Sequence, residues 1–175
     1  MAQPTTGDPS LDLTTAHKLR LEGKTNEALV AYERIASNKT VSAYDRGGAA
    51  LWSAHLLREK GEKRNAAKQY LDVADMESAH PHDRAGARLW YAHLLREKGD
   101  RKTAMTEYLK VATADGAHVH DQYGAKAWIG IMQFQDGNLR DAETTMKSIA
   151  PAEAAHPSDR QTAQDYLKKI ADSKK

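Results

Sequence analysis

The heptapeptide His-Leu-Leu-Arg-Glu-Lys-Gly at residues 55–61 recurs without change at residues 93–99. The two copies lie 38 residues apart, and single positions keep the same step along the chain. A glycine marks this step four times: Gly23, Gly61, Gly99 and Gly137. An interval of this size, kept over four copies, predicts a repeat architecture in which each unit buries its apolar face against its neighbours.

Three further positions recur after each glycine at distances typical of a helix. Small residues stand five positions after it: Ala28, Ala66, Ala104 and Ala142. Bulky residues follow four positions later: Tyr32, Tyr70, Tyr108 and Met146. β-Branched residues follow three positions later: Ile35, Val73, Val111 and Ile149. Spacings of three and four residues place these positions on one stripe of a helix, so this stripe is the predicted core.

Each unit is predicted to form two helices. In the second unit, Asp45 is a good N-cap, because its carboxylate can accept hydrogen bonds from the free N–H groups of the first turn. A first helix then runs to about Lys60, and Gly61 ends it in the left-handed conformation. A second helix covers about residues 64–76. The aspartate position recurs at the same step as Asp83, Asp121 and Asp159.

The two ends of the chain complete this organisation. The first unit begins at Asp8-Pro9, an N-cap followed by proline at the first helical position, and residues 1–7 are predicted to be disordered. The last helix, residues 160–173, has a lysine-rich tail that suits a helix covering the open end of a stack. We therefore expect an all-α solenoid of nine helices in one domain, residues 8–173. Its parts are repeats at about 8–44, 45–82, 83–120 and 121–158, and a capping helix at 159–173.

The composition excludes several classes of protein. A chain of 175 residues with 40% apolar residues can form one domain with a sizeable core. Its formal charge of +2 gives no reason to expect nucleic-acid binding. The lack of cysteine excludes disulfides and thiolate metal sites. No apolar run reaches the roughly 20 residues of a membrane helix, and residues 1–10 lack the apolar core of a signal peptide. The compartment stays open between cytoplasm and periplasm, because a removed signal peptide leaves no trace.

The pattern resembles the tetratricopeptide repeat (TPR) family over about residues 8–173. That family has a small residue in helix A, a glycine at the A–B turn, and an alanine, an aromatic and a β-branched or small residue along helix B. The small residues here stand seven positions before each glycine: Ala16, Ala54, Ala92 and Gly130. The period of 38 residues exceeds the usual 34, and the proline that usually ends helix B is missing. Four extra residues are close to one helical turn, so a longer helix A keeps the same face inward. This long period is similar to variants in bacterial envelope proteins.

The resemblance implies a right-handed superhelix whose concave groove is lined by the A helices. Members of the family mostly hold peptides or partner proteins in that groove. It therefore implies a non-catalytic scaffold for protein–protein interaction, without a cofactor. The sequence itself contains no glycine-rich phosphate loop, nucleophile motif or zinc-protease pair.

The candidate partner-binding residues follow from the two sides of helix A. At 100° per residue, Ala54 and Leu57 face helix B, whereas His55 and Arg58 lie on the opposite side, which is concave in the family. Equivalent positions form ladders along the chain: His17, Arg20, Leu51, His55, Arg58, Leu89, His93, Arg96, Ile131 and Phe134, with Trp52, Trp90 and Trp128 on the flank. Such a basic and aromatic surface suits an acidic protein segment with apolar anchors.

Each ladder also has a structural alternative. The arginines can pair with Glu59 and Glu97 in a solvated network. The tryptophans can pack one A helix on the next, and the histidines can be polar filling. If several histidines face one another, their protonation near pH 6.5 would add repulsion and make binding pH-dependent.

Histidines also recur at the turns between repeats, in His80-Pro81-His82-Asp83 and His118-Val119-His120-Asp121. His-x-His with a carboxylate can bind zinc or copper, but exposed turn residues copied by duplication explain the pattern as well, and no metal site is predicted. The leading hypothesis is a scaffold that binds a protein or peptide in its groove. The alternatives are self-assembly into a homo-oligomer and, less favoured, a metal-responsive protein.

Overall fold

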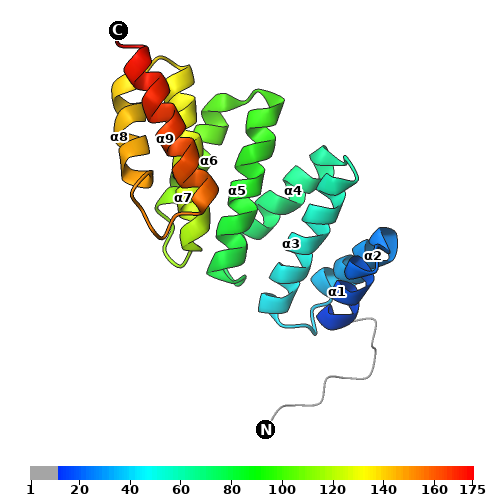
Figure 1. Ribbon diagram of the computed structural model, residues 1–175. Helices are drawn as coiled ribbons and strands as arrows, with labels where there is room; N and C mark the ends of the chain where they lie inside the picture. The colour runs from blue at the N-terminus through cyan, green and yellow to red at the C-terminus, as the bar shows by residue number, and fades with distance from the viewer. Residues whose placement is uncertain (1–11) are drawn as a thin grey trace. The chain divides into compact units, whose positions relative to one another are not determined.

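The chain is all-α in the computed structural model, which describes residues 12–175 (Figure 1). Within that range there are nine helices and no strand: α1 (Leu13–Leu21), α2 (Thr25–Ser37), α3 (Ala43–Glu59), α4 (Lys63–Ala74), α5 (Pro81–Lys98), α6 (Arg101–Ala112), α7 (Val119–Gln135), α8 (Leu139–Ile149) and α9 (Pro157–Asp172). The predicted helix pairs and the final helix are therefore confirmed. The predicted start at Asp8-Pro9 and the disorder of residues 1–7 lie outside the described residues; α1 itself begins after Asp12, whose carboxylate accepts a hydrogen bond from the Thr14 amide.

The four glycines of the repeat end the A helices as predicted. Their φ angles are positive: +74° at Gly23, +83° at Gly61, +92° at Gly99 and +79° at Gly137. At the second turn, the Gly61 amide donates to the Arg58 carbonyl and the Glu62 amide donates to the Leu57 carbonyl, at 3.0 and 2.9 Å. These two bonds form the Schellman motif, which satisfies carbonyl groups that the end of a helix leaves free.

The prediction of aspartate N-caps is wrong: the N-cap residues of three A-type helices lie three positions before the predicted aspartates. Helix α3 is capped by Ser42, whose hydroxyl oxygen accepts from the Asp45 amide at 3.0 Å and whose O–H donates to the Asp45 carboxylate at 2.7 Å. Helices α7 and α9 follow His118 and His156 as N-caps, so Asp121 and Asp159 stand in the first turn. A carboxylate there still stabilises the helix, because it lies near the positive end of the helix dipole.

Contacts divide the chain into two compact units, Met1–Arg84 and Ala85–Lys175, which are described separately. In the first unit, α1 packs on α2, α2 on α3 and α3 on α4. In the second, α6 packs on α7 and α7 on α8, and α9 contacts both α7 and α8. The final helix therefore covers the last pair, and it buries Ala163 and Ile170 in doing so.

The predicted stripe of helix B forms the core of both units. In the first unit, Ala28, Ala66, Tyr32, Tyr70, Ile35 and Val73 are at most 1% exposed. In the second unit, Ala104, Ala142, Tyr108, Met146, Val111 and Ile149 are all 0% exposed. Burial of these side chains is the main favourable contribution to the packing of each pair.

A second row of glycines, which the sequence analysis did not use, lies where successive A helices meet. A Cβ added to Gly48, Gly86 or Gly124 would lie 3.7 to 4.0 Å from the carboxylate of Asp83, Asp121 or Asp159, respectively. The aspartate in the first turn of one A helix thus packs against a glycine of the preceding A helix. Burial raises the pKa of Asp83 and of Asp159, and the nearby histidines oppose this shift.

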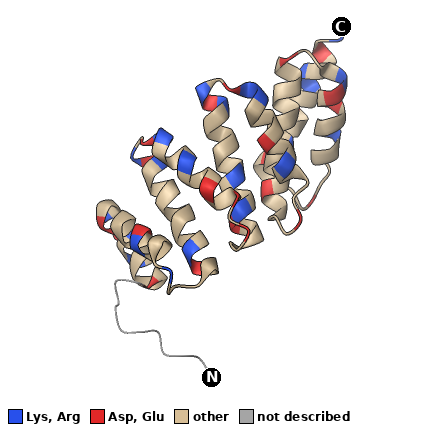
Figure 2. Ribbon diagram, turned by 180° about the vertical axis from the view of Figure 1, so that it is seen from behind, with Lys and Arg blue, Asp and Glu red and all other residues tan. Residues whose placement is uncertain are grey.

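Charges of both signs are interspersed over the two units, as Figure 2 shows. Among residues 12–175, no helix combines the length and the apolar character that crossing a membrane requires.

Candidate functional site

The predicted groove residues form compact clusters: clusters 1 and 3 are each built from the A and B helices of one repeat and the A helix of the next, and cluster 2 from the A and B helices of its own repeat. Cluster 1 consists of His17 and Arg20 on α1, Tyr32 on α2 and Trp52 on α3. Cluster 3 consists of His93 and Arg96 on α5, Tyr108 on α6 and Trp128 on α7. Cluster 2 consists of His55, Arg58 and Tyr70. In each, the tyrosine is buried and the histidine and arginine are half-buried.

The histidine of each cluster hydrogen-bonds to the buried tyrosine of its own repeat. The distance from Nδ1 to the hydroxyl oxygen is 2.5 Å for His17–Tyr32, 2.7 Å for His55–Tyr70 and 2.6 Å for His93–Tyr108. The histidines therefore have a defined hydrogen-bond partner in the core, which agrees with the structural alternative for them.

The tryptophan of the next A helix stacks on the tyrosine. In cluster 1, the Trp52 and Tyr32 ring centroids are 6.4 Å apart with 18° between the planes. In cluster 3, Trp128 and Tyr108 are 6.4 Å apart with 12° between the planes. These contacts correspond to the structural alternative for the tryptophans, because they pack one A helix on the preceding pair.

An arginine lies flat over each of these two tryptophans. The Arg20 guanidinium carbon is 4.3 Å from the Trp52 ring centroid, and the Arg96 guanidinium carbon is 3.9 Å from that of Trp128. Within residues 12–175, no carboxylate forms an ion pair with Arg20 or Arg96, and the Nε atoms of both are buried without a hydrogen-bond partner. The proposed arginine–glutamate network is therefore not formed by these two arginines.

Burial favours the uncharged form of the histidines of clusters 1 and 2 and of the tyrosines of all three polar clusters. Burial, followed by the charges of Arg58 and Arg20, lowers the pKa of His55 to about 4. Burial and the charge of Arg20 likewise lower the pKa of His17. Burial raises the pKa of Tyr70 to about 12 and that of Tyr108 to about 12. The expectation that repulsion between these histidines begins near pH 6.5 is therefore wrong for His17 and His55.

The direction of the hydrogen bonds follows from these protonation states. The guanidinium beside each tyrosine acts on its hydroxyl and favours the phenolate, which burial opposes. A guanidinium has only N–H donors, so the tyrosine oxygen faces a donor on that side and its O–H is left to donate to the histidine Nδ1. The second ring nitrogen of the histidine then carries the proton. In this tautomer, the second ring nitrogen of the histidine and the guanidinium of each polar cluster are both hydrogen-bond donors.

The fourth repeat replaces this polar cluster by an apolar one. Cluster 4 consists of Ile131, Phe134, Met146 and Tyr166, in the positions of the histidine, arginine, tyrosine and tryptophan. Phe134 and Tyr166 meet edge to face, with centroids 5.3 Å apart. Gly130 stands where the other repeats have alanine, because a Cβ there would lie 2.7 Å from the Met146 methyl carbon.

The remaining candidates differ in exposure. Leu51 and Trp90 are half-buried. Leu89 and Ile131 lie in the two core clusters of the second unit, 9% and 8% exposed, so a ligand would reach only the edge of either side chain.

The turn histidines stack in pairs, His80 on His82 and His118 on His120, at 4.6 and 5.4 Å between centroids. Over the described part of the chain, no group of three or more His, Asp or Glu is placed to hold a metal ion.

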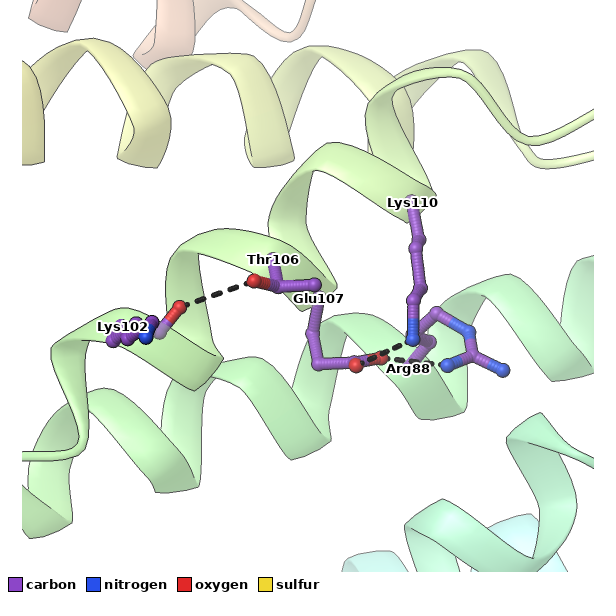
Figure 3. A network of polar contacts seen from close by, with 5 residues as sticks. All are labelled: Arg88, Lys102, Thr106, Glu107 and Lys110. Carbon is purple, nitrogen blue, oxygen red and sulfur yellow. Dashed lines mark hydrogen bonds and ion pairs between the residues drawn. The ribbon is translucent and has the colours of Figure 1, made fainter.

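One buried charge escaped the sequence analysis, which expected the carboxylates on solvated faces. Glu107 on α6 is 6% exposed and accepts from Arg88 on α5 at 2.6 Å and from Lys110 at 2.7 Å (Figure 3). Its equivalents in the other repeats are Ala31, Gln69 and Thr145. Because the pair occurs in one repeat alone, periodicity could not reveal it.

The comparisons with known proteins identify the fold. No protein-family model matches the chain, and no curated protein sequence matches it. Two solved structures are similar, both of a protein described as a kinesin light chain from Podosopora anserina with nearly identical TPR-like repeats. The first has a TM-score of 0.68 at 13% identity and covers 96% of this chain and 89% of its own. The second has a TM-score of 0.63 at 14% identity and covers 92% of this chain and 84% of its own.

The chain is thus a TPR-like repeat protein with an all-α solenoid fold. Folds of this type are typically non-catalytic and serve the binding of protein partners.

Proposed function

We propose that this protein is a non-catalytic scaffold in which the exposed edge of each of clusters 1 to 3 binds an acidic, partly apolar segment of a partner protein. The observation that carries this proposal is the pair Arg20 and Arg96, each held flat on a tryptophan and paired with no carboxylate of the described residues. A cation fixed in this way loses little conformational freedom on binding, and its planar fork matches a carboxylate.

The histidine and the arginine of each cluster support the same class of ligand. Both carry hydrogen-bond donors, so a carboxylate or a backbone carbonyl complements them, whereas an amine does not. Trp52 and Trp128 are half-buried and offer aromatic edges beside the cations. Cluster 4, with Phe134 and Tyr166, would contact an apolar anchor of the bound segment.

Cluster 4 also explains why the polar chemistry of the other clusters points to binding. Its four residues lie on α7, α8 and α9 and include no histidine, arginine or tryptophan. Stacking of the repeats therefore does not require these residue types, and their presence in three other repeats is explained by a ligand. The fold favours a scaffold over an enzyme as well, because TPR-like repeat folds are typically non-catalytic.

The test uses fluorescein-labelled peptides of about 15 residues with leucine at regular intervals and with glutamate, glutamine or lysine between the leucines. A graft variant converts cluster 3 into cluster 4 by Ala92→Gly, His93→Ile, Arg96→Phe, Tyr108→Met and Trp128→Tyr. Fluorescence anisotropy is expected to give tightest binding for the acidic peptide and at least about tenfold weaker binding by the graft variant.

The matched control places charge on another face, by Lys102→Glu and Lys110→Glu on α6, and is expected to bind as wild type does. Equal affinity of wild type and graft for the acidic peptide, or no preference of wild type for it, would contradict the proposal.

A further inference from the structure

The first helix pair carries an exposed apolar surface that the proposed binding face does not include. It borders a cavity of about 390 Å³. The residues used here are Thr15 and Leu19 on α1 and Glu27, Val30, Ala31 and Arg34 on α2, which we term the first-pair face. Val30 is 56% exposed and Ala31 is 8% exposed, so Val30 supplies most of the apolar area at the centre of this face.

The repeat shows what this face does elsewhere in the first unit. One repeat on, the positions of Leu19, Glu27, Val30, Ala31 and Arg34 are Leu57, Asn65, Lys68, Gln69 and Asp72. These residues line a second cavity, of about 430 Å³, opposite Leu29 and Glu33 of α2. In the second repeat, the equivalent face is therefore turned towards the preceding B helix, with a cavity between the two helices.

The two faces differ in their chemistry. At its centre, the face of the second repeat carries Lys68 and Gln69, whereas the first-pair face carries Val30 and Ala31. An apolar centre is costly to expose to water and gains free energy when another apolar surface covers it. The residue composition of the first-pair face therefore suits contact with a partner surface, whereas that of its counterpart suits a solvent-filled groove.

Its charges are arranged symmetrically about that apolar centre. Glu27 precedes Val30 by three residues and Arg34 follows Ala31 by three residues, and this spacing places all four on one stripe of α2. If a second α2 packs antiparallel on this stripe, Val30 and Ala31 meet their own copies, and each glutamate faces an arginine. Arg34 also interacts within its own chain, and its five donors allow it to serve a second acceptor.

From this arrangement we infer that the first-pair face binds a second copy of the chain through a two-fold, antiparallel α2–α2 contact. Glu27 then pairs with Arg34 of the partner subunit, and Arg34 with Glu27 of the partner subunit. A two-fold contact uses the same patch on both protomers, which requires a self-complementary surface such as this one. The inference is independent of the proposed function, because clusters 1 to 3 lie on other residues.

The test measures the mass of the full chain by sedimentation over a range of concentrations. Wild type is expected to dimerise. Glu27→Arg and Arg34→Glu, both at exposed positions, are each expected to weaken the dimer about tenfold or more, because like charges then meet. Circular dichroism checks that each variant keeps the helical content of wild type.

Two further samples are specific to the two-fold arrangement. The double variant Glu27→Arg with Arg34→Glu is expected to regain the dimer, because its charges are again complementary. An equimolar mixture of the two single variants is expected to form heterodimers although neither forms homodimers. Monomeric wild type, a dimer indifferent to both single changes, or a mixture without heterodimers would each overturn the inference.

Discussion

Cluster 3 and cluster 4 occupy equivalent positions of neighbouring repeats and hold their helices together by different chemistry. In cluster 3, a hydrogen bond joins His93 to Tyr108 and a guanidinium covers Trp128. In cluster 4, all four positions have become apolar or weakly polar, and Phe134 meets Tyr166 edge to face. The small residue of helix A has changed with them, because Gly130 leaves room for the flexible end of Met146. The difference teaches that equivalent positions between stacked helices can be filled either by a hydrogen-bonded polar set or by an apolar set.

The largest effect is expected when the buried centre of cluster 3 is emptied. Tyr108→Ala removes a fully buried ring on which Trp128 and His93 pack, and should lower the free energy of unfolding by about 3 to 5 kcal/mol. Tyr108→Phe keeps the ring and loses the hydroxyl, so it should cost about 1 to 2 kcal/mol. Urea unfolding measures both. Equal losses would mean that the hydrogen bond, and not the packing, holds cluster 3 together.

The buried ion pair beside cluster 3 should give the next effect. Glu107→Ala leaves Arg88, whose side chain is 15% exposed, without its carboxylate, and should cost about 3 kcal/mol. The equivalent residue of the fourth repeat is Thr145, whose hydroxyl donates to Gln133 at 2.8 Å, and Thr145→Ala should cost about 1 kcal/mol. Thermal unfolding of the two variants compares them directly. A Glu107→Ala protein as stable as Thr145→Ala would show that the ion pair contributes little.

Lowering the pH should reduce the stability contributed by a polar cluster, which contains a histidine, and not that contributed by cluster 4, which contains none. The unfolded chain protonates His55 near pH 6.5, whereas the folded chain protonates it near pH 4. Between these values only the unfolded state binds the proton, so stability present above pH 6.5 is lost as the pH falls towards 4, by on the order of 2 kcal/mol. His55→Gln keeps an acceptor for Tyr70 and should flatten this part of the curve. Unfolding curves at several pH values give the free energy of unfolding of both proteins as a function of pH. The same dependence on pH in both proteins would contradict the account.

The helices and turns were predictable from the sequence because their causes are local and repeated. Gly61 and its equivalents end helices through their backbone conformation, and the stripe that contains Tyr32 and Val73 follows from helical periodicity. The position of Asp45 was misread, since an acidic residue is favourable both as N-cap and in the first turn, and Ser42 three residues earlier was the better cap.

The clusters were predictable in membership but not in their bonding. Residue spacing placed His93 and Arg96 on the same face of one helix. The hydrogen bond between His93 and Tyr108, however, joins residues of two different helices that are 15 positions apart in the sequence. One signal was available: histidine and tyrosine recur at this interval three times and are replaced together by Ile131 and Met146. The buried Glu107 had no such signal, because it belongs to one repeat only.

The smallest effect on stability is expected for the graft of cluster 4 into the third repeat. Its five substitutions reproduce a set that already packs at Gly130 and Met146, so the free energy of unfolding should change by less than about 2 kcal/mol. Ala92→Gly alone should cost about 1 kcal/mol, because glycine inside a helix has greater freedom to lose on folding. Urea unfolding of the graft, compared with Ala92→Gly alone, measures the remainder. A graft that fails to fold would show that the polar residues are needed for stacking.

The tryptophans offer the most direct test of the proposed binding face, because Trp52 and Trp128 belong to clusters 1 and 3 and Trp90 to neither. Their indole N–H groups give separate NMR signals, which can be followed while the acidic leucine peptide is added to the labelled protein. We expect the signals of Trp52 and Trp128 to shift progressively to saturation, and the lysine-containing peptide to leave them unmoved. Saturable binding of the acidic peptide with all three indole signals unchanged would place the binding site elsewhere on the molecule and contradict the proposed function.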